Sequence, residues 1–197
     1  ALPNDAAHIS TDGDCGTGTA INSGGGYNFT LDHKASYLTL LPYSTINFST
    51  AVKLTQVKIT ADEALSGQFN FDDSGIDLGS RPAPTPANRS ITLTLSGGGT
   101  NGFVIPVAAA KETNSPIMVL PPGTYNNVSI EYTLYDQFTT KTETIKKEYA
   151  TLTFVPGKNK KISTKKLQQI LYFMVAYWTF IYNLETVRDS CSLLPFQ

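Results

Sequence analysis

The stretch from Leu120 to Asp136, LPPGTYNNVSIEYTLYD, constrains the fold of this chain more than any other. It opens with a Pro-Pro-Gly turn, in which proline fixes φ and glycine allows a positive φ. Apolar and polar residues then alternate from Val128 to Tyr135. A period of two is typical of a β-strand that is apolar on one face and solvated on the other. Other strands must therefore cover its apolar face.

Further short strands are expected along most of the chain. Alternation predicts strands at Tyr27–Leu31, Ala35–Leu41, Val52–Ile59, Leu65–Phe71, Ile91–Leu95, Phe103–Val107, Ile117–Leu120 and Ala150–Phe154. They recur about every 8–12 residues between segments rich in Gly, Pro and Asn. No stretch before Lys160 has a helical period. This pattern predicts an all-β fold, an antiparallel β-sandwich of about seven strands.

The predicted strand Val52–Ile59 carries an irregularity. Its first two apolar residues are even-numbered, and its last two are odd-numbered. Such a change of parity predicts a β-bulge near Thr55 and Gln56, or a crossing between sheets.

Two turn-rich segments interrupt the strands. The glycines of Gly97–Gly102 are predicted to close a hairpin between the strands at 91–95 and 103–107. The segment Asp72–Asn88 contains three prolines and predicts a long exposed loop.

Composition divides the chain into three parts. Residues 1–26 are rich in Gly, Ser, Thr, Asn and Asp, which predicts a flexible leader. Residues 27–164 form the predicted sandwich domain. Residues 165–197 form a C-terminal tail whose stretch Ile170–Tyr182 is almost entirely apolar, and either a helix or an extra strand fits it. A helix of this length would span about 20 Å, short of the ~30 Å bilayer core, which argues against a transmembrane segment.

Neither composition nor motifs indicate catalysis. The net charge of −1 gives no basis for nucleic-acid binding. No nucleophile elbow, metal-ligand spacing or nucleotide fingerprint occurs, so we expect no catalytic residue, no cofactor and no metal. His8 and His33 are expected in loop or edge positions rather than as general bases. Asp12, Asp14 and Gly16 resemble the start of a calcium loop but lack its later ligands.

The remaining reactive and charged residues also favour structural roles. Cys15 and Cys191 lie near opposite ends of the chain, and two separate thiols are favoured while a disulfide stays open. The basic run Lys158–Lys166 is interpreted as a solvated edge or linker. The richness in Thr, Asn and Gly favours an exported protein.

Several segments, taken together and in order, resemble the fimbrillin family of Bacteroidales pilus subunits. They are HKASYLTLLPYS, VKLTQVKITADEALSGQFNFD, SITLTLSGG, VLPPGTYNNVSIEYTLYD and ATLTFVPGKNKKI, within roughly residues 33–162. The resemblance implies a transthyretin-like, Greek-key sandwich in an exported, often lipid-anchored subunit. It also implies assembly on the outer surface and a role in adhesion. Relatives usually carry two such sandwiches, whereas this sequence has room for one and a tail.

The predicted function is a non-catalytic structural subunit of a bacterial fimbria or pilus, or an associated adhesion protein, at the cell outer membrane. The expected partners are other pilus subunits or further copies of the chain. Family pilins polymerise by β-strand donation, for which the tail is the candidate. The expected assembly segment contains Ile170, Leu171, Phe173, Val175, Tyr177, Trp178, Phe180 and Ile181. The alternatives are a monomeric surface module that binds glycans or proteins, a tail that packs on its own domain, and a small hydrolase.

Overall fold

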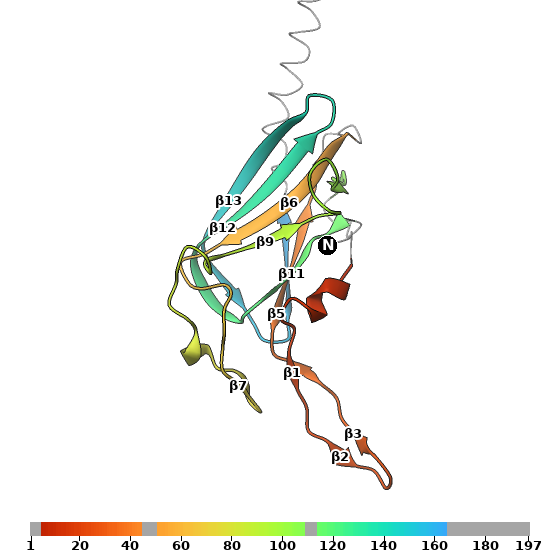
Figure 1. Cartoon of the computed structure of the whole chain (residues 1–197), viewed down its shortest axis with the longest axis vertical. Helices are drawn as coiled ribbons and strands as arrows, with labels where there is room; N and C mark the ends of the chain where they lie inside the picture. Colours follow the sequence, from red (N-terminus) through yellow and green to blue (C-terminus); the bar gives the residue numbers. More distant parts are fainter. Residues whose placement is uncertain (1–4, 45–50, 109–113, 165–197) are drawn as a thin grey trace, which may run out of the picture.

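The computed structural model describes residues 5–44, 51–108 and 114–164 of the chain. Two β-sheets enclose one hydrophobic core and form a sandwich (Figure 1). The prediction of an all-β sandwich is confirmed. Two 3₁₀ turns, η1 (Ala7–Ser10) and η2 (Leu78–Ser80), lie wholly within these residues. Within the described ranges, no helix is both long and apolar enough to span a membrane.

The larger sheet has five strands. They are β10 (Phe103–Val104), β6 (Val52–Thr60), β12 (Gly123–Asp136) and β13 (Lys141–Phe154), with β9 (Ser90–Thr94) also paired to β6. Every pair in this sheet is antiparallel. β12 lies between β6 and β13, so the strand marked by the Pro-Pro-Gly turn is an interior strand of the sheet.

The smaller sheet contains a parallel pair that the sequence did not predict. Its order is β11 (Ile117–Leu120), β5 (Ser36–Pro42) and β14 (Asn159–Thr164). β11 is antiparallel to β5, but β14 runs parallel to it. The reason is the turn after β13: Gly157 donates its N–H to the carbonyl of Ala35, which delivers the chain to the start of β5. The described part of the basic run therefore lies on an edge strand, as interpreted from the sequence.

Thr55 is the bulge residue of β6. Leu54 and Gln56 lie opposite Leu134 and Thr133, which are consecutive in β12, so Thr55 is the extra residue. Its side chain is buried, and its hydroxyl donates to the Thr133 carbonyl at 3.2 Å. The predicted bulge is confirmed. It allows the apolar residues on both sides of Thr55 to face the core despite their opposite parity.

A second change of parity occurs in β12. Tyr125 is buried before the change, and Val128 is buried after it. Between them, Asn127 has a φ of +47°, a left-handed conformation that asparagine adopts more readily than most residues. The alternating apolar residues of β12 therefore all contribute to one core.

The core lies between the two sheets. Its largest fully buried side chains are Tyr125, Tyr132, Phe103, Phe154, Leu38, Leu40, Leu54, Ile59, Leu65, Leu95, Met118 and Leu120. The rings of Tyr125 and Phe154 meet edge to face, with centroids 5.7 Å apart. The hydroxyls of Tyr132 and Thr164 form a hydrogen bond of 2.8 Å that joins β12 to β14. Burying a large apolar side chain stabilises the fold by about 1.5–3 kcal/mol, so this cluster is the main source of stability.

The glycine-rich turn does not close the predicted hairpin. β9 and β10 both pair with the edge of β6 that is turned away from β12. The chain leaves this edge after Leu95, whose N–H bonds the Thr55 carbonyl at 2.9 Å, and returns at Phe103. The glycines thus form a loop that interrupts one edge. The hairpin prediction is wrong because turn chemistry specifies where a chain turns but not which strand it then joins.

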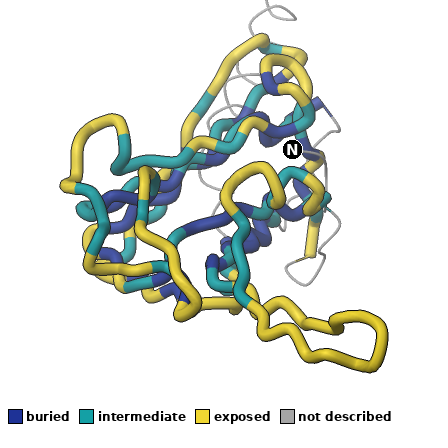
Figure 2. The backbone as a smooth tube through the Cα atoms, turned by 60° about the horizontal axis from the view of Figure 1, so that its bottom comes forward, coloured by how far each residue is buried: buried dark blue, intermediate teal, exposed yellow. Residues whose placement is uncertain are grey.

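Residues 16–33 form a ribbon that projects from the sandwich (Figure 1 and Figure 2). In it, β1 (Gly16–Thr17) pairs with β4 (Asp32–His33), and β2 (Ile21–Asn22) pairs with β3 (Tyr27–Asn28). The ribbon crosses the predicted boundary between leader and sandwich at residue 26. Whether residues 1–26 are flexible stays a prediction.

The strand predicted at 27–31 is only partly present, as β3 at Tyr27–Asn28, and its apolar residues are not covered by the core. Tyr27, Phe29 and Leu31 are 70%, 63% and 54% exposed. Their alternation is real, but the segment pairs with the chain just before it rather than with a sheet of the core.

The strand predicted at 65–71 is also largely wrong. Of its residues, Phe71 alone is in a strand, in the short hairpin of β7 (Phe71–Asp72) and β8 (Gly75–Ile76). Gly67 has a φ of +132°, and a Cβ there would lie 2.7 Å from Pro82 Cγ, so the extended pattern breaks at this glycine. The loop predicted at 72–88 contains β8 and η2.

Candidate functional site

Two recesses lie at the end of the sandwich from which the ribbon projects. One is an apolar cavity at the edges of the two sheets, and the other is an open cleft between the ribbon and the β7–β8 hairpin. Phe71 borders both of them. Ligands bind preferentially in such concave places, so these recesses are the candidate site.

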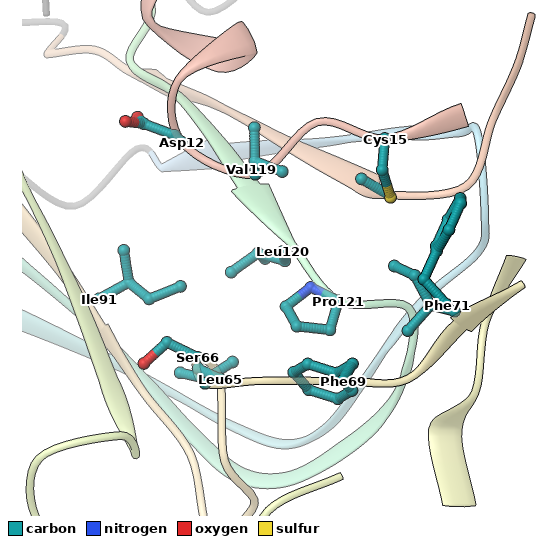
Figure 3. A pocket seen from close by; sticks show the side chains of 14 residues that line it. Asp12, Cys15, Leu65, Ser66, Phe69, Phe71, Ile91, Val119, Leu120 and Pro121 are labelled. Atoms are coloured by element: carbon teal, nitrogen blue, oxygen red, sulfur yellow. The ribbon is translucent and has the colours of Figure 1, made fainter. Parts of the chain in front are cut away.

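The apolar cavity has a volume of about 310 Å³. Its apolar side chains surround the space in Figure 3: Leu65, Phe69, Phe71, Ile91, Val119, Leu120 and Pro121. Asp12, Cys15 and Ser66 supply the polar part of the lining. This lining suits an apolar group such as a side chain of another protein segment and disfavours a charged one, because burying an unpaired charge is costly.

The cavity lies beside an open sheet edge. β11 is the terminal strand of the smaller sheet, and in the described part of the chain its only strand partner is β5. η1 contacts this edge without pairing as a strand. Its His8 donates from Nε2 to the Ile117 carbonyl at 2.9 Å, which satisfies one outward-facing group of β11. Val119 and Leu120, further along β11, line the cavity.

The ribbon forms the first wall of the cleft. Residues that pair across two strands share a face, so Thr17 lies beside Asp32 and Ile21 beside Asn28. All four border the cleft. The strands approach closely at Gly18, where a Cβ would lie 2.7 Å from the Thr30 carbonyl oxygen.

The β7–β8 hairpin forms the second wall, with Phe71, Asp72 and Asp73. The Asp72 carboxylate accepts hydrogen bonds from the hydroxyl and N–H of Ser74, which fix the turn and lower the pKa of Asp72. Gly75 lies against the Lys34 side chain, since a Cβ there would be 3.0 Å from Lys34 Cγ. Lys34 therefore supports the hairpin and also borders the cleft.

Asp14, His33 and Tyr37 connect the base of the ribbon to β5. The Tyr37 hydroxyl donates to Asp14 Oδ1 at 2.5 Å and lies 2.8 Å from His33 Nδ1. His33 Nδ1 is 3.1 Å from the same Asp14 oxygen. Burial, followed by the hydrogen bond to Asp14, raises the pKa of Tyr37 far above its usual value, so its hydroxyl stays protonated. We call these three residues the ribbon latch.

The cysteine next to the ribbon latch, Cys15, is not an activated nucleophile. Cys15 lies next to Asp14 in the chain, and its burial, then the Asp14 charge, raise the pKa of the thiol. A protonated thiol is a weak nucleophile. What the contacts of the latch residues show is a connection that holds the ribbon base to β5.

The histidines and aspartates that the sequence analysis considered lie at different places in the structure. His33 is at the ribbon base and His8 is against the β11 edge, and both positions fit the predicted loop and edge roles. Asp12 and Asp14 do not converge: Asp12 borders the apolar cavity, whereas Asp14 bonds Tyr37. Among the described residues, no group of three or more His, Cys, Asp or Glu could hold a metal ion.

The predicted assembly segment, Ile170–Ile181, lies outside the described residues, as does Cys191. Its role, and the relation of Cys15 to Cys191, stay predictions.

Sequence reasoning missed the cleft. The alternation of apolar residues predicts strands at its aromatic residues Phe29 and Phe71, and it gives no indication of a cleft. A signal was present in the three consecutive glycines Gly24–Gly26, which separate β2 from β3 and mark the tip of a hairpin.

No protein-family model matches this sequence, and no curated protein matches it. The relation to the fimbrillin family stays a resemblance.

Proposed function

We propose that this chain is a non-catalytic structural subunit of a bacterial surface fimbria or an associated adhesion protein, exported to the cell outer membrane. It assembles with copies of itself or with other subunits. The observation that supports this function is the open edge of β11 beside the apolar cavity. A strand added to this edge extends the smaller sheet, and its inward side chains enter the cavity beside Val119 and Leu120.

The proposed occupant of this edge is the tail of another copy. The tail is apolar from Ile170 to Tyr182, which matches the lining of the cavity in character. A long apolar segment of a secreted chain must be covered by some surface. The competing possibility is that the tail packs on its own sandwich.

Deletion of Leu167–Gln197 distinguishes these two possibilities. The full chain is expected to form oligomers or filaments, observed by light scattering and negative-stain electron microscopy. The truncated chain is expected to remain monomeric with an unchanged melting temperature. A truncated monomer with a clearly lower melting temperature would show instead that the tail stabilises its own domain.

A substitution in the cavity tests the place of assembly. Ser66 borders the cavity and is only partly buried, so Ser66→Lys introduces a charge there without disturbing the deep core. We expect assembly at least about ten-fold weaker, a loss of about 1.4 kcal/mol. Thr92→Lys, at an exposed position of β9, is the matched control and should assemble normally. Normal filaments from Ser66→Lys would exclude the cavity as the assembly site.

A further inference from the structure

We propose that the open cleft between the ribbon and the β7–β8 hairpin binds a neutral oligosaccharide. The cleft has a volume of about 1090 Å³. Small-molecule sites usually measure about 300–1,000 Å³, so this cleft has room for an extended ligand that remains partly solvated. The sugar would be the ligand that the proposed adhesive function requires. Its binding does not depend on assembly through the tail.

Exposed aromatic rings are the first reason. Phe29 of the ribbon and Phe71 of the hairpin border the cleft from its two walls and are 63% and 48% exposed. Exposed apolar side chains that are rimmed by polar residues are typical of ligand-binding grooves. The C–H face of a sugar ring is flat and weakly apolar, and it packs on the face of such a ring.

The polar lining is the second reason. The side chains that carry hydroxyl, amide or carboxylate groups in the cleft are Thr17, Thr19, Asn28, Thr30, Asp32, Asp72 and Asp73. A sugar hydroxyl both donates and accepts, as the threonine hydroxyls and an asparagine amide do. A carboxylate accepts from two neighbouring hydroxyls at once, which a polyol offers and an apolar peptide does not. The mixture of aromatic and acceptor groups therefore fits a carbohydrate.

The charge of the lining selects among carbohydrates. Three carboxylates border the cleft, those of Asp32, Asp72 and Asp73. Among the described residues, Lys34 is the one cationic side chain that borders it. This excess of negative charge repels sialic acids, uronic acids and phosphates. A neutral oligosaccharide is the class that satisfies both the hydrogen-bonding groups and the charge.

The test is a titration of the full chain by isothermal calorimetry, with maltotriose, cellotriose and N-acetyllactosamine as neutral probes and sialyllactose as the anionic one. We expect at least one neutral probe to bind with a Kd of about 1 mM or tighter, and sialyllactose to bind at least about ten-fold more weakly. Phe71→Ala and Phe29→Ala should each weaken binding at least about ten-fold. Phe138→Ala lies outside the cleft lining, at the most exposed phenylalanine among the described residues, so it is the matched control and should bind normally.

The variants are informative because Phe29, Phe71 and Phe138 are all exposed, so melting temperatures should stay unchanged. The proposal is overturned if no neutral probe binds, if sialyllactose binds best, or if both cleft variants bind as well as the control. A filament-forming chain that binds no sugar would refute this inference alone. A strictly monomeric chain that binds a neutral sugar would refute only the assembly proposal.

Discussion

The guanidinium carbon of Arg81 lies 4.7 Å from the centroid of the Tyr125 ring. The same guanidinium donates from Nη1 to the Ala64 carbonyl at 2.7 Å and from Nη2 to the Pro122 carbonyl at 3.0 Å. The Tyr125 hydroxyl donates to the Pro121 carbonyl at 2.7 Å. Arg81 thus joins the loop after the β7–β8 hairpin to the Pro-Pro-Gly corner, and it holds one wall of the candidate site to the sandwich.

Replacing Arg81 should therefore destabilise the protein although the residue is not in the core. Arg81→Ala removes a cation–π contact and leaves two partly buried carbonyls without a donor, so we expect a loss of about 2 kcal/mol in the free energy of unfolding. Arg81→Lys keeps the charge but not the planar fork and should lose less. Urea denaturation measures both, with the exposed Lys158→Ala as control. A decrease of less than about 0.5 kcal/mol in the free energy of unfolding of Arg81→Ala would contradict this role.

Gly123 of the same corner should not tolerate a side chain. Its φ is +132°, and a Cβ there would lie 2.8 Å from Arg81 Nη2. Gly123→Ala therefore combines backbone strain with displacement of the Arg81 fork, and we expect a loss of about 2–3 kcal/mol. Gly97→Ala separates the two effects, because Gly97 also has a positive φ but has open space around it. Thermal and urea unfolding should show a clearly smaller loss for Gly97→Ala; equal losses would rule out the contact with Arg81.

The alternation of apolar residues predicted local structure well where a strand is covered by the core. It identified the core face of β12 from Val128 to Leu134, and a parity change was sufficient to predict the bulge at Thr55. In both cases the signal is physical, because side chains of a strand point to alternate faces and an extra residue inverts the order.

The same alternation did not predict which strands pair with each other or which faces the core covers. Tyr27, Phe29 and Leu31 have the pattern of a core strand, yet the ribbon exposes them. Periodicity states which residues share a face but not whether that face is covered. The cleft could not be predicted for the same reason, since Phe29 and Phe71 border it from two segments that are far apart in the sequence. The parallel pairing of β14 likewise depends on where the turn at Gly157 docks.

Stability should fall at alkaline pH because tyrosines are buried. Burial raises the pKa of Tyr132 and of Tyr125 above the ordinary value of 10.0. The folded state then holds these protons more tightly than the unfolded state, so the stabilisation is complete below pH about 10 and declines as the pH rises further. Each such tyrosine contributes a slope of up to about 1.4 kcal/mol per pH unit.

Tyr132→Phe tests this dependence. At neutral pH it loses the hydrogen bond to Thr164 and about 1 kcal/mol. Above pH about 10 its unfolding free energy should decline less steeply than that of the parent protein, so the two curves converge. Tyr27→Phe, at a residue that is 70% exposed, is the control and should follow the parent curve. If the curves of Tyr132→Phe and of the parent protein stay parallel above pH about 10, Tyr132 does not cause the loss of stability at alkaline pH.

The ribbon latch should control the mobility of the ribbon rather than the stability of the sandwich. Tyr37→Phe keeps the ring but removes the hydroxyl that bonds Asp14 and contacts His33. We expect this change to lower the free energy of local opening of the ribbon by about 1 kcal/mol. The amides of residues 16–33 should then exchange about five-fold faster. The exchange of β12 amides should be unchanged, because they report opening of the core.

Hydrogen exchange followed by mass spectrometry measures both regions in one experiment. Tyr27→Phe is again the matched control, since it removes a hydroxyl from the same ribbon without touching the latch. If the ribbon forms a wall of the sugar site, Tyr37→Phe should also weaken binding of the neutral probe while leaving Phe29 and Phe71 in place. Unchanged exchange in residues 16–33 would show that the pairing of β1 with β4 holds the ribbon without the latch.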